Sequence, residues 1–576
     1  MALFPKTPGV YIQEIPVFPA SVAAVPTAIP VFIGYTETGE QNKAIRIASL
    51  LEYQANFGGP FNEPFKATLK GSAVDISIAF ANTNEPQFRL FYHLQMYFAN
   101  GGGPCYIISV GDYTSTNIDG PDLLNAIQYA EEVDEITLIL VPEAMATGTF
   151  GVSDPDRQNI YDGMLAHCAK MQDRFSILDV EVRGSTIFND SNLFRNNNVG
   201  TNNLKYGAAY YPSLESGLSF AYADTGVTLI SNLTPLPPAN IQAYNGKTLD
   251  VLKTGIPATN SVTTPNGTTP PLTGNLTITI PSQTPQVIAL SSLAGPTAHD
   301  VAVSLAAAIN GNVVLNQFIT AGVPTGTSTV VPLKTIALSS SGNLIAVVSS
   351  SGDAVVSTAT FVGGADIDTL LYARISSALQ IFPMPLYPSS TMAGIYAAVD
   401  NDRGVWKAPA NVSVTLVDSL GVVITDQDQE GLNVDPSGGK SINAIRNFIG
   451  RGNLVWGART LAGNDNEWRY ISVRRLFIFV EDSIKHASQF VVFEPNDKNT
   501  WVRVKGMITN FLTDLWKSGA LAGDKPEQAF FVKVGLNETM SPQDILEGKL
   551  IIQIGLAAVR PAEFIILQFM HKLQEA

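Results

Sequence analysis

The fold depends most on one stretch near the end of the sequence, KLIIQIGLAAVRPAEFIILQFM at Lys549–Met570. Two apolar runs, 549–559 and 562–570, flank Arg560-Pro561. Successive side chains of a strand point to opposite faces, and both faces of the second run are almost entirely apolar. Such a strand must be covered on two sides. Because terminal segments fray unless they are docked, we expect this one to add to an open sheet edge of a neighbouring subunit.

The first 20 residues have a related character. Prolines at positions 5, 8, 16 and 19 bracket one uninterrupted run, Gly9–Ile15. Proline donates no ladder hydrogen bond, so this run alone can pair fully. A lone strand is unstable and needs a sheet, which belongs either to its own chain or to another copy. Its two faces are Val10, Ile12 and Glu14 on one side, and Tyr11, Gln13 and Ile15 on the other.

From about residue 25 to 215, strand-like and helix-like segments alternate, which indicates an α/β layer with partly parallel strands. The fold class expected for the chain is therefore α/β, in a mixed α+β arrangement of several domains. The expected strands are Ile29–Gly34, Tyr106–Val110, Ile136–Val141, Ser176–Val180 and Tyr206–Tyr211, and the expected helices include Pro121–Glu131 and Asp156–Met171.

The composition changes at Thr254–Gly364, where only Asp300, Lys334 and Asp353 carry a full charge. Short β-type runs rich in Thr, Ser and Gly predict an inserted β-rich domain. A neutral polar surface fits an exposed decoration of a particle, and equally a carbohydrate- or cell-binding module. Its expected elements are strands at Leu276–Ile280, Val287–Leu290, Thr329–Ile336, Leu344–Val348 and Ala354–Phe361, and a helix at Thr297–Asn310.

Charge and cysteine usage exclude several classes of protein. The 576 residues carry a net charge of −15, which disfavours a nucleic-acid coat. No apolar run approaches about 18 residues, the length of a membrane-spanning helix, and the first residues lack the apolar core of a secretory signal. The two cysteines cannot form a disulfide scaffold. Residues 440–576 carry a net charge of +3 against −18 before them, so this quarter could face an acidic partner.

Sequence motifs for chemistry fail one after another. Gly438–Ser441 resembles the end of a phosphate loop, but the required earlier glycine is Val434. Asp426–Gly431 begins like a calcium loop but has Ser437 where a bidentate Glu is needed. Cys168 lies on an apolar helical face and reads as a core residue. The five histidines show no metal-ligand spacing. We therefore expect no catalytic residues, no metal site and no cofactor.

Eight segments taken together resemble one known family. They are TPGVYIQEI (Thr7–Ile15), YYPSL (Tyr210–Leu214), MPLYPSSTMAGIYAAVDNDRGVWKAPAN (Met384–Asn411), RNFIGRGNLVWGARTL (Arg446–Leu461), EWRYISVRRLFIFVEDSI (Glu467–Ile484), VVFEPND (Val491–Asp497), FLTDLWKSGAL (Phe511–Leu521) and GKLIIQIGLAAVRPAEFIIL (Gly548–Leu567). Their order and density resemble the contractile tail sheath proteins of phages and phage-like injection systems. The resemblance covers about three quarters of the chain and gives the Thr254–Gly364 insert no role.

The resemblance implies a structural subunit that polymerises as stacked hexameric rings around an inner tube and contracts to drive the tube through a target envelope. Implied partners are further copies, the inner tube protein, baseplate proteins and tail terminator or cap proteins, with no nucleic acid, and the target membrane is met only through the tube. The particle would assemble in a bacterial cytoplasm as a phage tail or a tail-like device, and it could be released.

The resemblance also implies roles for particular residues, with both terminal arms adding strands to another subunit's C-terminal domain. The implied N-terminal arm is Val10, Tyr11, Ile12, Gln13, Glu14 and Ile15, and the C-terminal arm is Phe564, Ile565, Ile566, Leu567, Gln568 and Phe569. The implied acceptor strands hold Phe531, Val532, Lys533, Ile551, Ile552, Gln553 and Ile554.

Phe511–Ala520 reads as an amphipathic helix that either faces the tube or packs the domain core. Expected tube contacts are Asp514, Lys517, Arg503 and Lys505. The expected domains are an N-terminal arm (1–20), an α/β sheath domain (21–215 and 371–439), an inserted surface domain (216–370), a C-terminal domain facing the tube (440–561) and a C-terminal arm (562–576). Competing functions are a static tube or surface-layer protein, and a surface hydrolase or lectin built on the insert.

Overall fold

The computed structural model describes residues 22–81, 88–147, 151–184, 186–265, 271–435 and 438–566. The chain divides into two compact units. Unit 1 holds residues 1–60, 84–218 and 384–576, and unit 2 holds residues 61–83 and 219–383. The expected N-terminal arm residues, Val10–Ile15, lie outside the described part of the chain.

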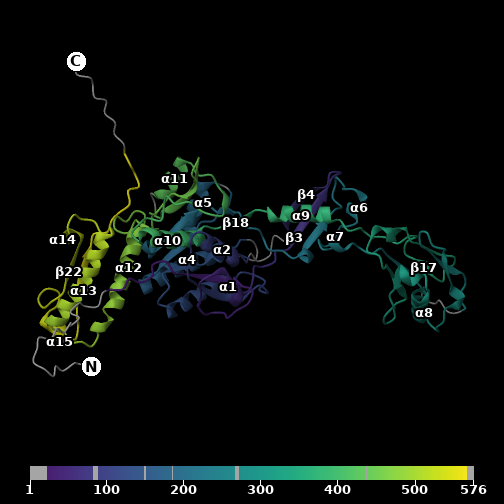
Figure 1. Ribbon diagram of the computed structural model, residues 1–576, viewed down its shortest axis with the longest axis horizontal. Coiled ribbons are helices and arrows are strands. Elements are labelled where there is room, and N and C mark those ends of the chain that lie inside the picture. The colour runs from purple at the N-terminus through teal and green to yellow at the C-terminus, as the bar shows by residue number, and fades with distance from the viewer. Residues whose placement is uncertain are drawn as a thin grey trace, which may run out of the picture. The chain divides into compact units, whose positions relative to one another are not determined.

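Unit 1 is built on an eight-stranded mixed sheet (Figure 1). The six inner strands are parallel, and the two edge strands β2 and β21 are antiparallel to their neighbours. All five strands expected between residues 25 and 215 are present, so the predicted α/β layer is confirmed. In spatial order they are β2 (Ile45–Ile47), β5 (Cys105–Asp112), β1 (Pro30–Thr36), β6 (Leu138–Leu140), β7 (Phe175–Asp179), β8 (Gly207–Tyr211), β20 (Ile442–Phe448) and β21 (Gly452–Val455).

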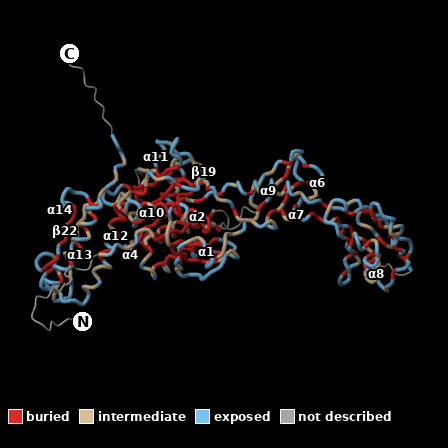
Figure 2. Tube along the Cα trace, in the orientation of Figure 1, coloured by how far each residue is buried: buried red, intermediate tan, exposed pale blue. Residues whose placement is uncertain are grey.

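Helices cover this sheet, and burial is concentrated in its strands (Figure 2). Helix α2 packs on α10, and α3 packs on α4. Helix α4 begins where the Ser153 hydroxyl accepts the Asp156 amide, with Pro155 in its first turn, an arrangement typical of helix starts. The helices are α1 (Leu50–Phe57), α2 (Leu90–Ala99), α3 (Gly120–Ala126), α4 (Asp154–Met171), α5 (Ile187–Leu193), α10 (Ser389–Arg403) and α11 (Asp426–Asn433). A small sheet joins β18 (Met384–Leu386), β9 (Leu214–Ser216) and β19 (Val417–Leu420).

The last part of unit 1 is the C-terminal domain, which we define as residues 471–559. Two long helices carry one two-stranded antiparallel sheet. Its elements are α12 (Ile471–Ala487), α13 (Lys498–Lys517), α14 (Pro526–Ala529), β22 (Phe530–Lys533), α15 (Pro542–Leu546) and β23 (Gln553–Leu556).

Unit 2 contains two β-rich parts, each with its own sheets. The first is the three-stranded sheet β10 (Val227–Ile230), β3 (Phe65–Lys70) and β4 (Asp75–Phe80), accompanied by α6 (Ala239–Gln242), α7 (Val251–Thr254) and α9 (Thr369–Gln380). The second is the predicted β-rich insert, in which two small sheets and α8 (Ala298–Gly311) enclose one apolar core. Its strands are β11 (Thr259–Thr263), β12 (Asn275–Thr279), β13 (Gln286–Ala289), β14 (Ile319–Ala321), β15 (Val330–Thr335), β16 (Ala346–Ser349) and β17 (Val355–Val356).

The compact units differ from the expected domain boundaries in two places. Unit 2 takes residues 61–83 from the expected sheath domain and extends to residue 383 rather than 370. Strands β20 and β21 complete the main sheet, although they begin the segment assigned to the C-terminal domain at residue 440. The physical reason is that strand pairing is non-local. Strand β3 pairs with β10, which lies more than 150 residues later, and local patterning carries no information on that partner.

Four phenylalanines bind together the four chain segments that enter and leave unit 2. Phe65 and Phe80 stack at 5.4 Å between ring centroids. Phe220 packs edge-on against Phe80 at 5.5 Å, and Phe382 does the same at 5.2 Å. These residues lie near the ends of residues 61–83 and 219–383. We call them the phenylalanine cluster. Their ring contacts pack the beginnings and ends of the two segments of unit 2 into one group.

Phe220→Ala is therefore expected to lower the free energy of unfolding of unit 2 by about 3–5 kcal/mol, because Phe220 is 4% exposed and its ring contacts three others. Differential scanning calorimetry measures the change. Phe188→Ala is the matched control, since that ring is 72% exposed. Equal transition temperatures for the two variants would show that the cluster does not hold unit 2 together.

Candidate functional site

The C-terminal domain is organised by two helices packed face to face. Helix α13 is capped by Asp497, whose carboxylate accepts the amides of Asn499 (2.9 Å) and Thr500 (3.0 Å). Its buried stripe meets the buried face of α12 in one apolar cluster. That cluster contains Leu476, Phe479, Val480, Val504, Met507, Ile508, Leu512 and Leu515.

The two-stranded sheet lies against this cluster. Strands β22 and β23 pair antiparallel, with Phe531 opposite Gly555 and Lys533 opposite Gln553. Phe530 and Val532 are buried in the apolar cluster, whereas Phe531 is 51% exposed. A two-stranded ribbon is marginal by itself, so the helices beneath it supply its stability.

The strand that contains β23 is paired along one edge only. Beyond β23 the hydrogen bonds continue along the same edge. The Ala557 amide donates to the Ala529 carbonyl, and the Ala557 carbonyl accepts the Ala522 amide. The Val559 amide donates to the Ala520 carbonyl. Alternation then directs the main-chain groups of residues 554, 556 and 558 to the opposite edge. No strand among the described residues pairs with that edge. Residues 554–559 are only half-buried although the sequence IGLAAV is apolar. This edge is an open template for another strand.

The chain that leads out of the N-terminal region is fixed to α12. The Val25 amide donates to the Ser483 hydroxyl (3.3 Å), and the Arg475 guanidinium donates to the Thr27 carbonyl (2.7 Å). Arg475 is 3% exposed, pairs with Asp400 at 2.5 Å and lies over the Tyr396 ring. A buried, fully paired arginine gives residues 25–27 one defined path over the domain.

The C-terminal segment is fixed by a second buried arginine. Arg459 contacts Glu563 through Nε (3.0 Å) and Nη2 (2.5 Å), and its Nη1 donates to the Asn433 carbonyl (3.2 Å). The Asn443 side chain donates to the Arg459 carbonyl and accepts the Arg459 amide. Because Asn443 lies in β20, these bonds fix the Arg459 backbone to the main sheet. Immediately after this pair, residues 564–566 are 74–82% exposed. We call the Arg459–Glu563 pair the arm clip.

The structure describes only part of the expected C-terminal arm. Phe564, Ile565 and Ile566 are large apolar side chains left in solvent, as expected for a segment that needs a partner. Leu567, Gln568 and Phe569 lie outside the described residues, as do Val10, Tyr11, Ile12, Gln13, Glu14 and Ile15.

Five of the seven expected acceptor residues lie in the paired strands, and two do not. Phe531, Val532 and Lys533 are in β22, and Gln553 and Ile554 are in β23. Ile551 and Ile552 precede β23. The reason lies in the turn that follows β22 at Gly535. The Thr539 hydroxyl in this turn donates to the Ile551 carbonyl (2.7 Å), so that carbonyl does not pair with β22.

The four expected tube-contact residues all lie exposed on α13, but not on one face. At about 100° per residue, Arg503, Asp514 and Lys517 fall within roughly 60° of one another, and Lys505 points to the other side of the exposed surface. Asp514 and Lys517 pair at 3.8 Å, and Arg503 lies over the Phe490 ring.

The helix predicted at Phe511–Ala520 is the second half of α13, which ends at Lys517. Its apolar face packs the domain core. Leu512 and Leu515 are buried, and Phe511 and Trp516 contact the same cluster.

The rejected motifs have structural roles. Lys440 is buried; its ammonium donates to the carbonyls of Arg195 and Val199 instead of standing free for phosphate. Asp428 and Thr425 form the capping box at the start of α11. The Cys168 thiol is buried beside Ser176, and burial raises its pKa to about 12. No group of three potential metal ligands occurs within the described ranges.

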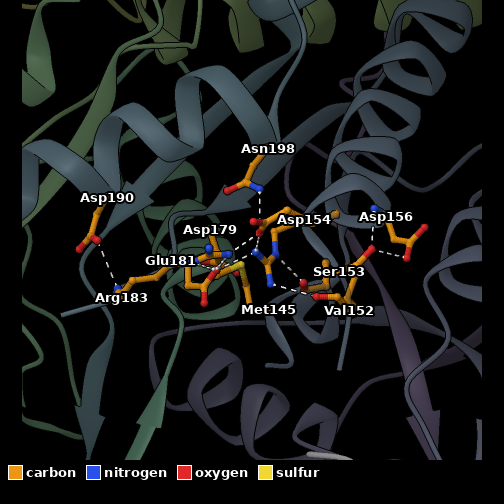
Figure 3. A network of polar contacts seen from close by, with 12 residues as sticks. Met145, Val152, Ser153, Asp154, Asp156, Asp179, Glu181, Arg183, Asp190 and Asn198 are labelled. Carbon is orange, nitrogen blue, oxygen red and sulfur yellow. Dashed lines mark hydrogen bonds and ion pairs between the residues drawn. The ribbon is translucent and has the colours of Figure 1, made fainter. Parts of the chain in front are cut away.

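A network of polar contacts surrounds the start of α4 (Figure 3). Arg157 is 2% exposed and donates to Asp154 (2.9 Å), Glu181 (2.7 Å) and the Ala144 carbonyl (2.9 Å). Arg183 completes it by contacting Asp154 and Glu181. Arg157 and Arg183 thus join α4 to the segment after β7 through Asp154 and Glu181.

Open parallel sheets usually bind ligands at the carboxyl ends of their strands, where the chain direction switches. Here β1 is that switch point, with β5 on one side and β6 on the other. Beside the end of β1 lies the Glu143 side chain. It accepts the amide of Tyr35 (2.7 Å) and the amide of Arg89 at the start of α2 (3.1 Å). Burial raises the pKa of Glu143 to about 7, against the opposing effect of these hydrogen bonds. The amides at the start of α2 are therefore bonded by a side chain of the protein itself.

Comparison with known proteins connects this architecture to a family. Residues 463–571 match the model of the phage tail sheath C-terminal domain. Over 99% of its length the chain is similar to a protein in the helical sheath of the anti-feeding prophage in its contracted state, at 26% identity and a TM-score of 0.54, with 100% of that protein covered. This chain is related to contractile sheath proteins.

Two further proteins are similar to this chain, one over its full length and one over about a third of it. The chain covers 99% of a protein in the contracted sheath complex of the extracellular contractile injection system PVC, over its own full length, at 25% identity and a TM-score of 0.51. A tail sheath protein of Vibrio phage KVP40 is 24% identical over 189 residues, 32% of this chain. That match spans only 26% of the phage protein's length.

These similarities confirm the sheath resemblance and the mixed α/β fold. No helix within the described residues has both the length and the apolar character to cross a bilayer. Sequence reasoning missed Arg459, Arg475 and Glu563, whose contacts fix the described chain at Thr27 and at Glu563. Each lies inside a segment that carried the resemblance, but a single sequence does not indicate which distant residue an arginine will meet.

The arm clip predicts the behaviour of Glu563→Gln. Loss of the charge removes a charge-assisted contact that contributes about 1.5–3 kcal/mol, so the segment after residue 563 is released at least about tenfold more often. Chymotrypsin cleavage after Phe564 measures this release. Glu527→Gln, at an exposed glutamate, is the control. Indistinguishable cleavage rates for both variants and the unaltered chain would contradict the clip.

Proposed function

We propose that this chain is the structural subunit of a contractile sheath. Copies of it stack as hexameric rings around an inner tube and contract to drive the tube through a target envelope. The observation that carries the proposal is the half-buried, one-sided strand at residues 553–559 together with the exposed apolar segment after Glu563. One copy has an open sheet edge and also an exposed apolar segment, residues 564–566, that pairs with no strand among the described residues.

The proposed link between subunits is strand donation. Residues 10–15 of one copy and 562–576 of another add to the β22–β23 sheet of a third. Each main-chain hydrogen bond contributes about 0.5–1.5 kcal/mol, so a few bonds per arm form a connection that large rotations leave intact. A 20-residue arm spans about 65 Å when extended, enough to bridge adjacent subunits. A head-to-tail contact of this kind does not close and so produces a filament.

Contraction in this proposal requires no catalysis. The extended sheath is a kinetically trapped polymer, and subunits rotate into a denser lattice while donated strands stay paired. The fixed paths at Thr27 and Glu563 support this division of labour, because each arm leaves a rigid body at a defined point. Bending is then confined to the linkers outside these points.

The proposed domain roles follow from charge and exposure. Residues 440–561 carry the basic balance of the chain and face the tube, with Arg503, Asp514 and Lys517 as contacts on one face of α13 and Lys505 on another. Residues 216–370 decorate the outer surface. Further proposed partners are the baseplate and the terminator or cap proteins, in a particle assembled in a bacterial cytoplasm.

The rival functions predict different observations. A static tube or surface-layer protein shares the arms but has one lattice, so two helical forms in electron micrographs would decide for a sheath. A lectin built on the insert needs a polar site lined by aromatic rings. Between Thr254 and Gly364 the sequence has only Phe318 and Phe361, and Phe361 is fully buried. This composition disfavours glycan recognition by the insert.

Deletion of residues 1–18 is expected to leave a folded, soluble subunit that no longer polymerises, because one donated strand is lost. Ile12→Pro acts in the same direction by removing one ladder donor, and Ile12→Val is its matched control. Negative-stain microscopy and sedimentation measure polymer length, and circular dichroism checks the fold. Polymers of normal length from the deletion variant would refute the role of the N-terminal arm.

A further inference from the structure

The β-rich insert is joined to the first part of unit 2, which contains β10, β3 and β4, by two crossings of the chain. These crossings, residues 254–258 and 362–368, lie side by side and pair antiparallel. The Ile256 amide donates to the Ala365 carbonyl (2.8 Å), and the Ala365 amide donates to the Ile256 carbonyl (3.0 Å). The chain therefore enters and leaves the insert at one place, as a narrow double strand.

Asp366, in the outgoing crossing, is bonded to both parts of unit 2. Its carboxylate accepts the amide (3.0 Å) and the hydroxyl (2.6 Å) of Ser340, which lies in a loop of the insert. Its backbone carbonyl accepts the hydroxyl of Tyr244, a residue of the first part that is 2% exposed. Asp366 thus connects a loop of the insert to a buried side chain of the first part.

The same loop holds the outgoing crossing at a second point. The Asn343 side chain accepts the Gly364 amide (2.9 Å) and donates to the Gly364 carbonyl (2.9 Å). The Ser340 bonds hold the pKa of Asp366 below its ordinary value, so this acceptor is charged at neutral pH and its bonds are of the stronger, charge-assisted kind. We call the Ser340–Asp366 and Asn343–Gly364 contacts together the clasp.

Each crossing also contains a glycine in the left-handed region, with φ of 77° at Gly255 and 79° at Gly363. A Cβ added to Gly255 would lie 2.1 Å from the Leu338 carbonyl oxygen, so only glycine lets the loop approach the incoming crossing this closely. Glycine has the widest range of backbone conformations, and a few residues at the ends of elements are enough to form a hinge. The two crossings therefore have the composition of a hinge.

We propose that the clasp holds the insert in one orientation on the first part of unit 2, and that opening the clasp lets the insert turn about Gly255 and Gly363. The proposal concerns unit 2 alone and does not depend on the proposed function. Ser340 and Asp366 are exposed, so water can replace their contact. The apolar core of the insert consists of residues between Ala258 and Phe361, and turning at the crossings leaves it intact.

The distance between two spin labels in the full chain, measured by pulsed electron paramagnetic resonance, tests the proposal. Labels at Val323→Cys in the insert and Leu236→Cys in the first part report the orientation, since these positions are 60% and 52% exposed. The two native cysteines are buried. Asp366→Ala removes both bonds to Ser340 and is expected to broaden the distance distribution at least about twofold.

Asp353→Ala is the matched control. The Asp353 carboxylate also accepts an amide (2.8 Å) and a hydroxyl (3.0 Å), here from Thr273, but both residues lie inside the insert. This variant should keep the narrow distribution of the unaltered chain. Ser340→Pro serves if Asp366→Ala fails to fold. It removes both donors, and proline suits the first position of the short helix at Ser340–Leu344.

Broadening in the clasp variants, with the Asp353→Ala control unchanged, supports the proposal. A distribution that stays narrow in Asp366→Ala and in Ser340→Pro would overturn it, because other contacts then hold the insert. A broad distribution in the unaltered chain, or equal broadening in the control, would overturn it as well, since the clasp then does not set the orientation. Thermal melts of each variant check that the fold is retained.

Discussion

The structure depends on a main-chain constraint in the C-terminal domain. An apolar strand, residues 553–559, has one edge satisfied by its own chain and one edge without a partner strand in the described residues. Buried or half-buried amides and carbonyls need hydrogen-bond partners, and a two-stranded ribbon cannot supply them on both sides. The helices α12 and α13 hold this incomplete sheet in place through the apolar cluster beneath Phe530 and Val532.

Two buried arginines fix the chain near the two ends of its described part. Arg475 fixes the incoming chain at Thr27, and Arg459 fixes the outgoing chain at Glu563. A guanidinium held in a forked ion pair costs little further ordering when the attached segment engages a partner, because its direction is already set. Within unit 1, the described chain thus has defined positions near both of its ends, at Thr27 and at Glu563.

The sequence alone predicted the local features well. The alternation at residues 25–215 gave the strands of the main sheet, since continuous apolar runs such as Pro30–Thr36 are typical of buried parallel strands. The charge-poor composition located the β-rich insert. The pairing of Phe65–Lys70 with a strand more than 150 residues away was not predictable, and neither were the shortened acceptor strand at Ile551 and Ile552 or the partner of Arg459. Each depends on long-range contacts that no local pattern encodes.

Strands from other copies are expected to complete the β22–β23 sheet. A high-resolution cryo-electron microscopy map of the assembled polymer tests this strand donation. The expected map has a sheet of more than two strands in the C-terminal domain, with residues 564–566 of a neighbouring copy beside residues 554–558. A two-stranded sheet in the polymer, with both chain ends folded on their own subunit, would contradict it.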